Sequence, residues 1–224
     1  AYEIYQCDWS SDVCSSDLDR DAPVASRRGE GILFFTRAED HNLRTPRGFY
    51  APVLDPWYEV ASRRWPCRKA EIRTNRFDDT AARVFHTDAY EAPAFDTDFP
   101  LLKDLLFNVR MFTMTVTKWL AMEFGIPYAQ LGEQLGQYLV NCWYQKEQLR
   151  GLLGQARPSL LVTSCCYLRP TFSVTWAARE QGIPVVDAQH GGNGPFHMGY
   201  THWRHVPDES YQVLPDGYLT WDAI

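Results

Sequence analysis

The segment that decides the fold runs from residue 158 to residue 192 and reads "PSLLVTSCCYLRPTFSVTWAAREQGIPVVDAQHGG". Its first part, Pro158 to Tyr167, is an apolar run that predicts a buried strand. A helix is expected over Arg169 to Gly182, with Pro170 in its first turn and Gly182 at its end. A second apolar strand is expected over Ile183 to Gly192. Strands that are apolar on both faces and joined by a short helix indicate a β-α-β unit of a parallel sheet.

The same alternation is expected on the N-terminal side. "GILFFTRA" (31–38) predicts a buried strand, "DPWYEVASRRW" (55–65) a helix with Asp55 as its N-cap, and "AEIRT" (70–74) a second strand. The connection 39–54 is unusually long, and such loops are often functional. The sequence therefore predicts an α/β fold, a Rossmann-like parallel sheet flanked by helices.

Further elements are expected around this framework. A strand is expected within "ARVFH" (82–86), and helices over 101–124 and 128–153, the second ending at Gly154. The methionines of the first of these helices are interpreted as core filling. "YLTWDAI" (218–224) starts another apolar run.

Residues 1–18 contain "DWSSDVCSSDL", which has no apolar period of 2 or 3.6. These eleven residues, Asp8 to Leu18, look like one reading frame of adapter DNA used to prepare sequencing libraries. We interpret residues 1–18 as an assembly artefact, expect them to be disordered, and set them aside. The alternative is a short, disordered acidic leader.

Charge and cysteine content depend on this exclusion. The whole chain has a net charge of −6, but residues 1–18 hold four acidic and no basic residues, leaving 22 basic against 24 acidic residues, or −2. Such a balance does not indicate a nucleic-acid partner. The remaining cysteines, Cys67, Cys142, Cys165 and Cys166, form no C-x-x-C motif. Reduced thiols in a cytoplasmic protein are expected.

Polar residues follow the ends of three predicted strands, where open α/β sheets bind ligands. The candidate substrate-binding residues are Arg37, His41, Tyr167, Arg169, Gln189, Gly191, Gly192 and His197. His190 is the candidate catalytic residue, since a neutral imidazole can accept a proton near pH 7. A structural histidine at a strand end is the alternative.

A metal site is not expected. The spacing of His190, His197, His202 and His205 matches no ligand signature, and we expect no cofactor.

The ordered set "PSLLVTSCCY", "AAREQGIPVVDAQHGGNGPFHMGY" and "LPDGYLTW", within residues 158–221, resembles GT-B-type glycosyltransferases of bacterial surface-polysaccharide synthesis, the capsule and O-antigen group. In that group, a strand-helix-strand leads to Gln-His-Gly, a loop with His and Gly-Tyr, and Pro-Asp-Tyr ahead of Trp-Gly. Here Trp221 is followed by Asp222 instead of glycine. The glycerophosphotransferases of teichoic-acid synthesis are similar, and their catalytic base corresponds to His190.

The resemblance implies two Rossmann-like domains across a cleft, the first binding the acceptor and the second the nucleotide-sugar donor. Residues 19–206 would form the acceptor-side domain, and residues 207–224 the interdomain connection and the truncated start of the donor domain. The partners would be a nucleotide-sugar and a glycan or lipid-linked acceptor. A cytoplasmic protein, compatible with peripheral association at the inner face of the membrane, is expected. The 224-residue chain alone is expected to be inactive.

Two other functions stay open. One is a nucleotide-sugar epimerase of the same fold, which would need an acid/base carboxylate pair near the donor. The other is a non-catalytic carbohydrate- or partner-binding domain.

Overall fold

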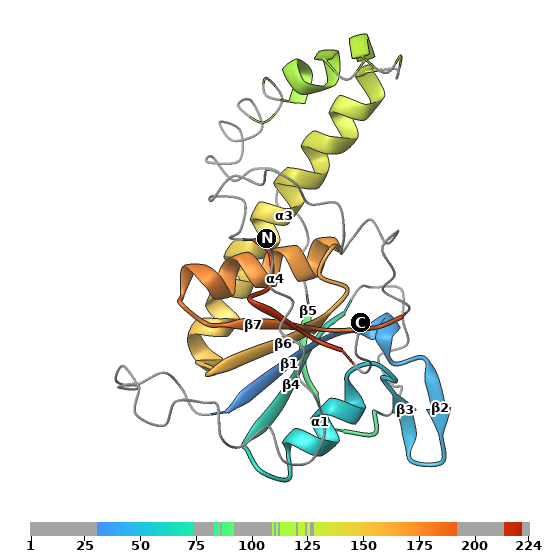
Figure 1. Ribbon diagram of the computed structural model, residues 1–224, viewed down its shortest axis with the longest axis vertical. Helices are drawn as coiled ribbons and strands as arrows, with labels where there is room; N and C mark the ends of the chain where they lie inside the picture. The colour runs from blue at the N-terminus through green and yellow to red at the C-terminus, as the bar shows by residue number, and fades with distance from the viewer. Residues whose placement is uncertain are drawn as a thin grey trace.

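Six parallel strands form the central sheet of the computed structural model (Figure 1). The structure describes residues 31–73, 83–85, 87–91, 109, 111, 113–119, 121–123, 125, 128–191 and 213–220. The strands are β1 (Ile32–Arg37), β4 (Cys67–Arg73), β5 (Asp88–Glu91), β6 (Leu160–Ser164), β7 (Val185–Ala188) and β8 (Gly217–Leu219). Their spatial order is β5-β4-β1-β6-β7-β8, with every pair parallel. This is the Rossmann order, so the expected fold class is confirmed.

Helices cover both faces of the sheet (Figure 1). α1 (Asp55–Ala61) packs on one face, where Phe34, Leu54, Val162 and Ala188 form a buried cluster. α3 (Tyr128–Ala156) and α4 (Arg169–Glu180) contribute to a larger cluster on the other face. Its members include Leu33, Phe35, Ile72, Leu149, Leu153, Leu161, Val174 and Val185. Since β1 contributes to both clusters, its four central residues are all buried.

The β-α-β unit at 158–192 forms as expected. Pro170 lies in the first turn of α4, and Gly182 follows the helix at φ 67°, a conformation suited to glycine. Other helix boundaries differ from those expected: the helix expected over 55–65 ends at Ala61. α3 runs through Gly154 to Ala156, and the chain turns at Arg157, whose φ is 44°. Asp55 is not the N-cap of α1: it is the first residue of the helix, and its carboxylate accepts a hydrogen bond from the Ala51 amide and contacts Lys69.

The long connection after β1 is ordered by backbone pairing. It contains the 3-10 helix η1 (Ala38–Asp40) and a hairpin of β2 (Leu43–Thr45) and β3 (Gly48–Tyr50). Phe49 of β3 makes an isolated parallel bridge with Arg83. Within the described part of 82–86, this bridge replaces the expected strand, and β5 follows at Asp88.

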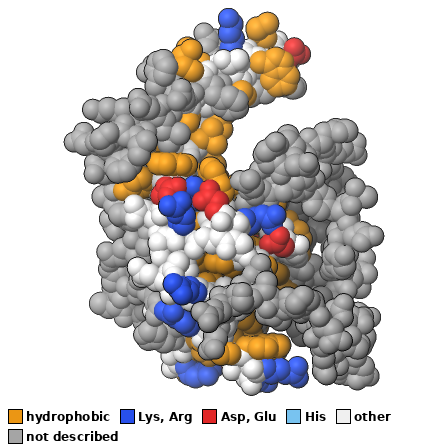
Figure 2. Space-filling model, turned by 90° about the vertical axis from the view of Figure 1, so that its left-hand side faces the viewer, with side chains coloured by type: hydrophobic (Ala, Val, Ile, Leu, Met, Phe, Trp, Pro, Cys, Tyr) orange, Lys and Arg blue, Asp and Glu red, His pale blue; other side chains and the backbone are white. Residues whose placement is uncertain are grey.

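A helical segment within residues 109–123 packs on the N-terminal half of α3, which projects from the body (Figure 1). A Cβ placed on Gly132 would lie 3.0 Å from Thr117 Oγ1, and one on Gly136 would lie 3.5 Å from Thr113 Oγ1. Met122 is 76% exposed, and Met111 and Met114 are also exposed. Their interpretation as core filling is therefore wrong, and Figure 2 shows hydrophobic side chains gathered at the projecting end. The close approach of the glycines brings the two helices together and leaves the methionines on the outer face.

Asp216 attaches the last described segment to the sheet. Its backbone amide and carboxylate Oδ2 pair with the carbonyl and amide of Val185, at 2.7 and 2.8 Å, and its Oδ1 contacts the Arg179 guanidinium. β8 then extends the sheet beside β7. The domain boundary between 206 and 207 stays a prediction. Residues 1–18 lie outside the described part of the chain.

Gly31 is expected to tolerate no side chain. Its φ is 97°, and an added Cβ would lie 2.4 Å from the Pro66 carbonyl oxygen, which accepts the Ile32 amide at 2.8 Å. Gly31→Ala is expected to lower the free energy of unfolding by about 1–3 kcal/mol, measured by urea denaturation. Gly151→Ala is the matched control: its Cβ would meet nothing within 4 Å in α3, so a gain of up to about 1 kcal/mol is expected. Equal effects of the two variants would contradict this account.

Candidate functional site

The carboxyl ends of β1, β6 and β7 meet at one edge of the sheet, because these strands are parallel neighbours. The chain order reverses between β1 and β6, and ligands of doubly wound sheets bind outside the carboxyl ends at such a switch point. The residues that the strands deliver to this edge are Arg37 from β1, Cys165 and Tyr167 after β6, and Gln189, His190 and Gly191 after β7. This edge is the candidate site.

Tyr167 and His190 are in direct contact at this edge. The Tyr167 hydroxyl lies 2.8 Å from His190 Nε2, and the ring centroids are 5.7 Å apart. The two residues are 23 positions apart in sequence, and the parallel pairing of β6 with β7 brings them together. Both are partly exposed, so the pair is accessible from solvent. Burial raises the pKa of Tyr167, and nearby Cys165, Cys166 and Asp187 act in the same direction, so its phenol keeps its proton at neutral pH.

Gln189 is fixed beside this pair. Its backbone amide donates to the Leu219 carbonyl at 2.8 Å, and its side-chain Nε2 donates to the Gly191 carbonyl at 2.7 Å. The residue is 8% exposed, and its Oε1 has no hydrogen-bond partner among the described residues. A buried amide oxygen without a partner costs free energy.

The turn from β6 into α4 is held in an unusual conformation. Cys165 has φ 57°, a left-handed value that is uncommon outside glycine. Its carbonyl accepts the Thr171 hydroxyl at 2.7 Å and the Leu168 amide at 2.9 Å, which hold the turn closed. Burial raises the pKa of Cys165 to about 11, so it stays a thiol at neutral pH. Conformations of this kind often occur at functional sites.

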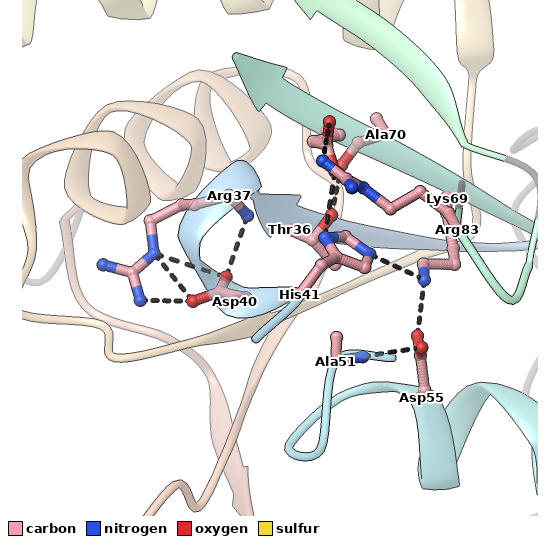
Figure 3. Close-up of polar contacts among 10 residues, drawn as sticks. Thr36, Arg37, Asp40, His41, Ala51, Asp55, Lys69, Ala70 and Arg83 are labelled. Carbon is pink, nitrogen blue, oxygen red and sulfur yellow. Dashed lines mark hydrogen bonds and ion pairs between the residues drawn. The ribbon is translucent and has the colours of Figure 1, made fainter. Parts of the chain in front are cut away.

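The Arg37 side chain is already bound by Asp40, three residues further along the chain. Its guanidinium Nε lies 3.1 Å from Asp40 Oδ1, and its backbone amide donates to Asp40 Oδ2 at 2.8 Å. Burial alone would lower the pKa of Arg37, but the hydrogen bond and charge of Asp40 outweigh it and raise the pKa. In Figure 3, Arg37 and Asp40 point away from His41. A substrate carboxylate or phosphate would have to share this guanidinium with Asp40.

The other expected site residues have different surroundings. Arg169 is the first residue of α4, and its charge acts on Tyr138 and Cys142 of α3. The His41 side chain is fully buried, with both ring nitrogens facing protein groups, which favours a structural role. Gly192 and His197 lie outside the described residues.

His41 belongs to a buried chain of polar side chains on the α1 face of the sheet (Figure 3). Its order is Asp55, Lys69, His41, Glu71 and Arg83. Lys69 Nζ contacts Asp55 Oδ1 and lies 3.1 Å from His41 Nε2. A lysine ammonium only donates, so Nε2 accepts and the His41 proton is on Nδ1. His41 Nδ1 lies 2.9 Å from Glu71 Oε2.

This buried network of polar side chains connects the segments that follow β1 to strand β4. Asp55 comes from α1, His41 follows η1, and Lys69 and Glu71 lie on one face of β4. The Lys69 ammonium also lies 5.8 and 5.6 Å from the ring centroids of Tyr58 and Phe85. Burial lowers the pKa of Lys69, although the hydrogen bond and charge of Asp55 oppose this effect.

Asp55 also decides what the start of α1 can bind. In dinucleotide-binding Rossmann folds, a glycine-rich turn after the first strand places a pyrophosphate at the helix N-terminus. Here the Asp55 carboxylate occupies the first turn of α1 and accepts the Ala51 amide at 2.8 Å. Because a buried carboxylate repels phosphate, the geometry opposes a dinucleotide at this position.

Glu71 is the most strongly perturbed acid in the described part of the network. Burial acts to raise the pKa of Glu71, but contacts with His41 and Arg83 outweigh it and lower the pKa to about 2. Arg83 Nε donates to Glu71 Oε2 at 2.9 Å. The Glu71 side chain is therefore a carboxylate throughout the neutral range.

The low pKa of Glu71 predicts acid-sensitive stability. Its folded pKa of about 2 lies below its ordinary value of 4.5, so the stabilisation is present above pH 4.5 and lost as pH falls towards 2. The difference corresponds to about 3 kcal/mol. In urea denaturation between pH 6 and pH 3, Glu71→Gln should flatten the decline of the unfolding free energy relative to the wild type. The control Glu59→Gln, at an exposed pair with Arg47, should leave the slope unchanged. An unchanged slope in Glu71→Gln would contradict the account.

Sequence reasoning missed Lys69, Asp55 as an ion-pair partner, and Asp216. One signal was available: the charged side chains of Lys69 and Glu71 stand two residues apart, hence on one face, in a strand buried inside the sheet. The expected strand began at Ala70 and so excluded Lys69. The pairing of Tyr167 with His190 had no sequence signal beyond their positions after adjacent strands.

Neither a metal centre nor a membrane span emerges from the described residues. Among them, no group of three or more histidine, cysteine, aspartate or glutamate side chains is arranged to hold a metal ion. No described helix is both long enough and apolar enough to cross a membrane.

No family model matches the chain, and no curated protein matches its sequence. Among solved structures, UDP-GlcNAc 2-epimerase from Neisseria meningitidis bound to UDP-GlcNAc is similar at 12% identity and a TM-score of 0.33 over 70% of this chain. Phytolacca americana UGT2, complexed with UDP-2fluoro-glucose and pterostilbene, is similar at 13% identity and a TM-score of 0.33 over 72% of this chain. The chain spans about 30% of the length of each, at 30% and 31%. Similarity at this level does not establish a common function.

Proposed function

We propose that the chain is the acceptor-side domain of a glycosyltransferase. The enzyme would transfer a sugar from a nucleotide-sugar to a hydroxyl of a surface-polysaccharide or glycolipid acceptor. The observation that carries the proposal is the placement of His190 at the carboxyl edge of the sheet, 2.8 Å from the Tyr167 hydroxyl. The resemblance of residues 158–221 to capsule and O-antigen glycosyltransferases supports it.

His190 acts as the general base in this proposal. The acceptor O–H bond breaks as its proton passes to the imidazole, and the acceptor oxygen forms a bond to the anomeric carbon. The bond between that carbon and the nucleoside diphosphate breaks, and the diphosphate leaves with the electron pair. Gln189 Oε1, buried without a partner among the described residues, would accept a hydrogen bond from a second acceptor hydroxyl.

The buried Asp55 favours the acceptor side over the donor side. A leaving diphosphate needs positive charge or open helix amides to stabilise it. The α1 N-terminus offers a carboxylate instead, whose ammonium partner Lys69 is fully buried. The nucleotide would therefore bind in another domain, and the remaining predicted ligands of the acceptor are Arg37, Arg169, Gly191, Gly192 and His197. Action at the cytoplasmic face of the membrane, on a lipid-linked acceptor, is part of the proposal.

A binding experiment on the 224-residue chain tests this division. We would titrate the isotope-labelled protein with UDP-N-acetylglucosamine and, separately, with a capsule or O-antigen oligosaccharide, and follow the NMR signals of His190, Tyr167 and Gln189. The oligosaccharide should shift these signals, and the nucleotide-sugar should leave them unchanged. Saturable binding of UDP-N-acetylglucosamine at this edge, with no effect of oligosaccharides, would contradict the assignment and favour the epimerase.

A further inference from the structure

We propose that the projecting helical arm is a membrane-contact element, and that one of its outer faces lies in the surface of a lipid bilayer. The arm consists of the described helical residues within 109–123 and of residues 128–138 of α3 (Figure 1). This inference deepens the proposed function and rests on it for the kind of membrane, the one that carries a lipid-linked acceptor. The arrangement of polar and apolar side chains on the arm supports it.

The segment 109–123 is polar where it packs on α3 and apolar where it faces solvent. Thr113 and Thr117 are both fully buried, and they contact the glycines of α3. The exposed large side chains are apolar: Met111 at 52%, Met114 at 50%, Trp119 at 55% and Met122 at 76%. A helix on the surface of a water-soluble protein has the opposite order, with its apolar side chains packed inward and its polar ones outside.

The contact between the two helices of the arm has a form suited to apolar surroundings. α3 presents Gly132 and Gly136, a G-x-x-x-G pair, and a Cβ added to Gly132 would lie 3.0 Å from Thr117 Oγ1. Small residues at this spacing let helices approach closely in lipid, where apolar side chains gain little by packing on one another. The Thr117 hydroxyl donates to the Thr113 carbonyl at 2.6 Å, so its proton is bound within the helix and needs no water.

The arm has one apolar and one polar outer face. Met122 follows the buried Thr113 by about two and a half helical turns, so it points away from α3. On α3, Gln134 stands midway between the two contact glycines and is exposed on the opposite side. Gln137 is also exposed, and its Nε2 donates to Asn141 Oδ1 at 3.2 Å. The segment 109–123 would therefore lie on the bilayer, with α3 on the aqueous side.

The size and charge of the apolar face favour a lipid surface over a second copy of the chain. Side chains exposed to this degree contribute on the order of 100–150 Å² each, about 500 Å² together, whereas a stable dimer buries roughly 800 Å² per partner. Tryptophan is also enriched where bilayers meet water. Lys118 is exposed on the segment and can extend its ammonium to an anionic headgroup. Glu123 is the other charge among the described residues of the segment, so apolar burial would dominate the binding.

Co-sedimentation with vesicles tests this contact without any assay of turnover. The 224-residue chain would be mixed with vesicles of equimolar phosphatidylethanolamine and phosphatidylglycerol. It should bind, and added salt should change its affinity less than about threefold. Met114→Gln/Met122→Gln should bind at least about tenfold more weakly. The matched control Leu43→Gln/Val60→Gln, at two exposed positions outside the arm, should bind like the wild type. Absence of binding by the wild type, or equal binding by the two double variants, would overturn the inference.

NMR of the chain with labelled methionine methyl groups identifies the face in contact. A paramagnetic reagent in the water should broaden the signals of Met111, Met114 and Met122 in the free chain, and bound lipid nanodiscs should protect them. Continued broadening of these signals on nanodiscs would overturn the inference, as would a dimer in solution that dissociates in Met114→Gln/Met122→Gln. Each of these failures leaves the transferase proposal standing, because no residue of the arm takes part in proton transfer. Full activity of His190→Ala would remove that proposal and leave the membrane contact unaffected.

Discussion

Replacing Lys69 by alanine is expected to lower the free energy of unfolding by about 3–5 kcal/mol, measured by urea denaturation at pH 7. Both side chains of the Lys69–Asp55 pair are fully buried, so removing the ammonium leaves the Asp55 carboxylate without a cation in a site that excludes water. The loss also removes the contacts of Lys69 with His41 and with the rings of Tyr58 and Phe85. Because this pair ties α1 and the hairpin to β4, the loss is expected to affect the whole α1 face of the sheet.

Two variants separate this effect from ordinary loss of packing. The double variant Lys69→Met/Asp55→Asn contains neither buried charge, and its side-chain amide oxygen can still accept the Ala51 amide, so it should be more stable than Lys69→Ala. Arg47→Ala removes an exposed pair with Glu59 and should change stability by less than about 0.5 kcal/mol. If Lys69→Ala and Arg47→Ala cost the same, the pair does not stabilise the fold in this way.

Replacing His190 by alanine is expected to reduce the kcat of the proposed glycosyltransferase by about 10²–10⁴-fold, the usual contribution of a general base. The side chain is only partly buried at the edge of the sheet, so the free energy of unfolding should change by less than about 1 kcal/mol. The fold and the binding of acceptor should therefore be retained while turnover is lost.

The pH dependence adds a second readout for His190. A general base acts only when neutral, so the wild-type kcat/KM should fall at acid pH. The small residual rate of His190→Ala should lack this acid limb. A variant that keeps both the wild-type rate and the acid limb would show that another group takes the proton.

The sheet and its β-α-β unit were predictable because their signals are local. Apolar runs such as Leu160–Ser164, a proline in the first turn of α4 and the left-handed Gly182 are each visible in a few adjacent residues. The position of His190 after a strand followed from the same logic. The Rossmann strand order places these strand ends at one edge, which residue periodicity alone does not show.

Only one part of the buried polar network had a sequence signal, the two charges of Lys69 and Glu71 on one face of a buried strand, because the other members come from separate elements. Asp55 looks like an ordinary surface charge in sequence, and only the folded structure brings Lys69 to Asp55 and Glu71 to His41. His41 was expected to bind substrate, yet its ring is buried between Lys69 and Glu71. The methionines were expected to be buried but are exposed. Gly132 and Gly136 of α3 face Thr117 and Thr113 of the neighbouring helical segment, while Met111 and Met114 of that segment face solvent.

Product analysis of the full-length enzyme is the most direct test of the proposed transferase activity. The purified protein would be incubated with UDP-N-acetylglucosamine or UDP-glucose labelled in the sugar, together with lipid-linked or free oligosaccharides from bacterial surface polysaccharide. Labelled saccharide product and UDP are expected to appear in equal amounts, and both should be lost in His190→Ala. Conversion of the nucleotide-sugar to its epimer without lasting transfer, or binding with no turnover of any donor, would contradict the proposed activity.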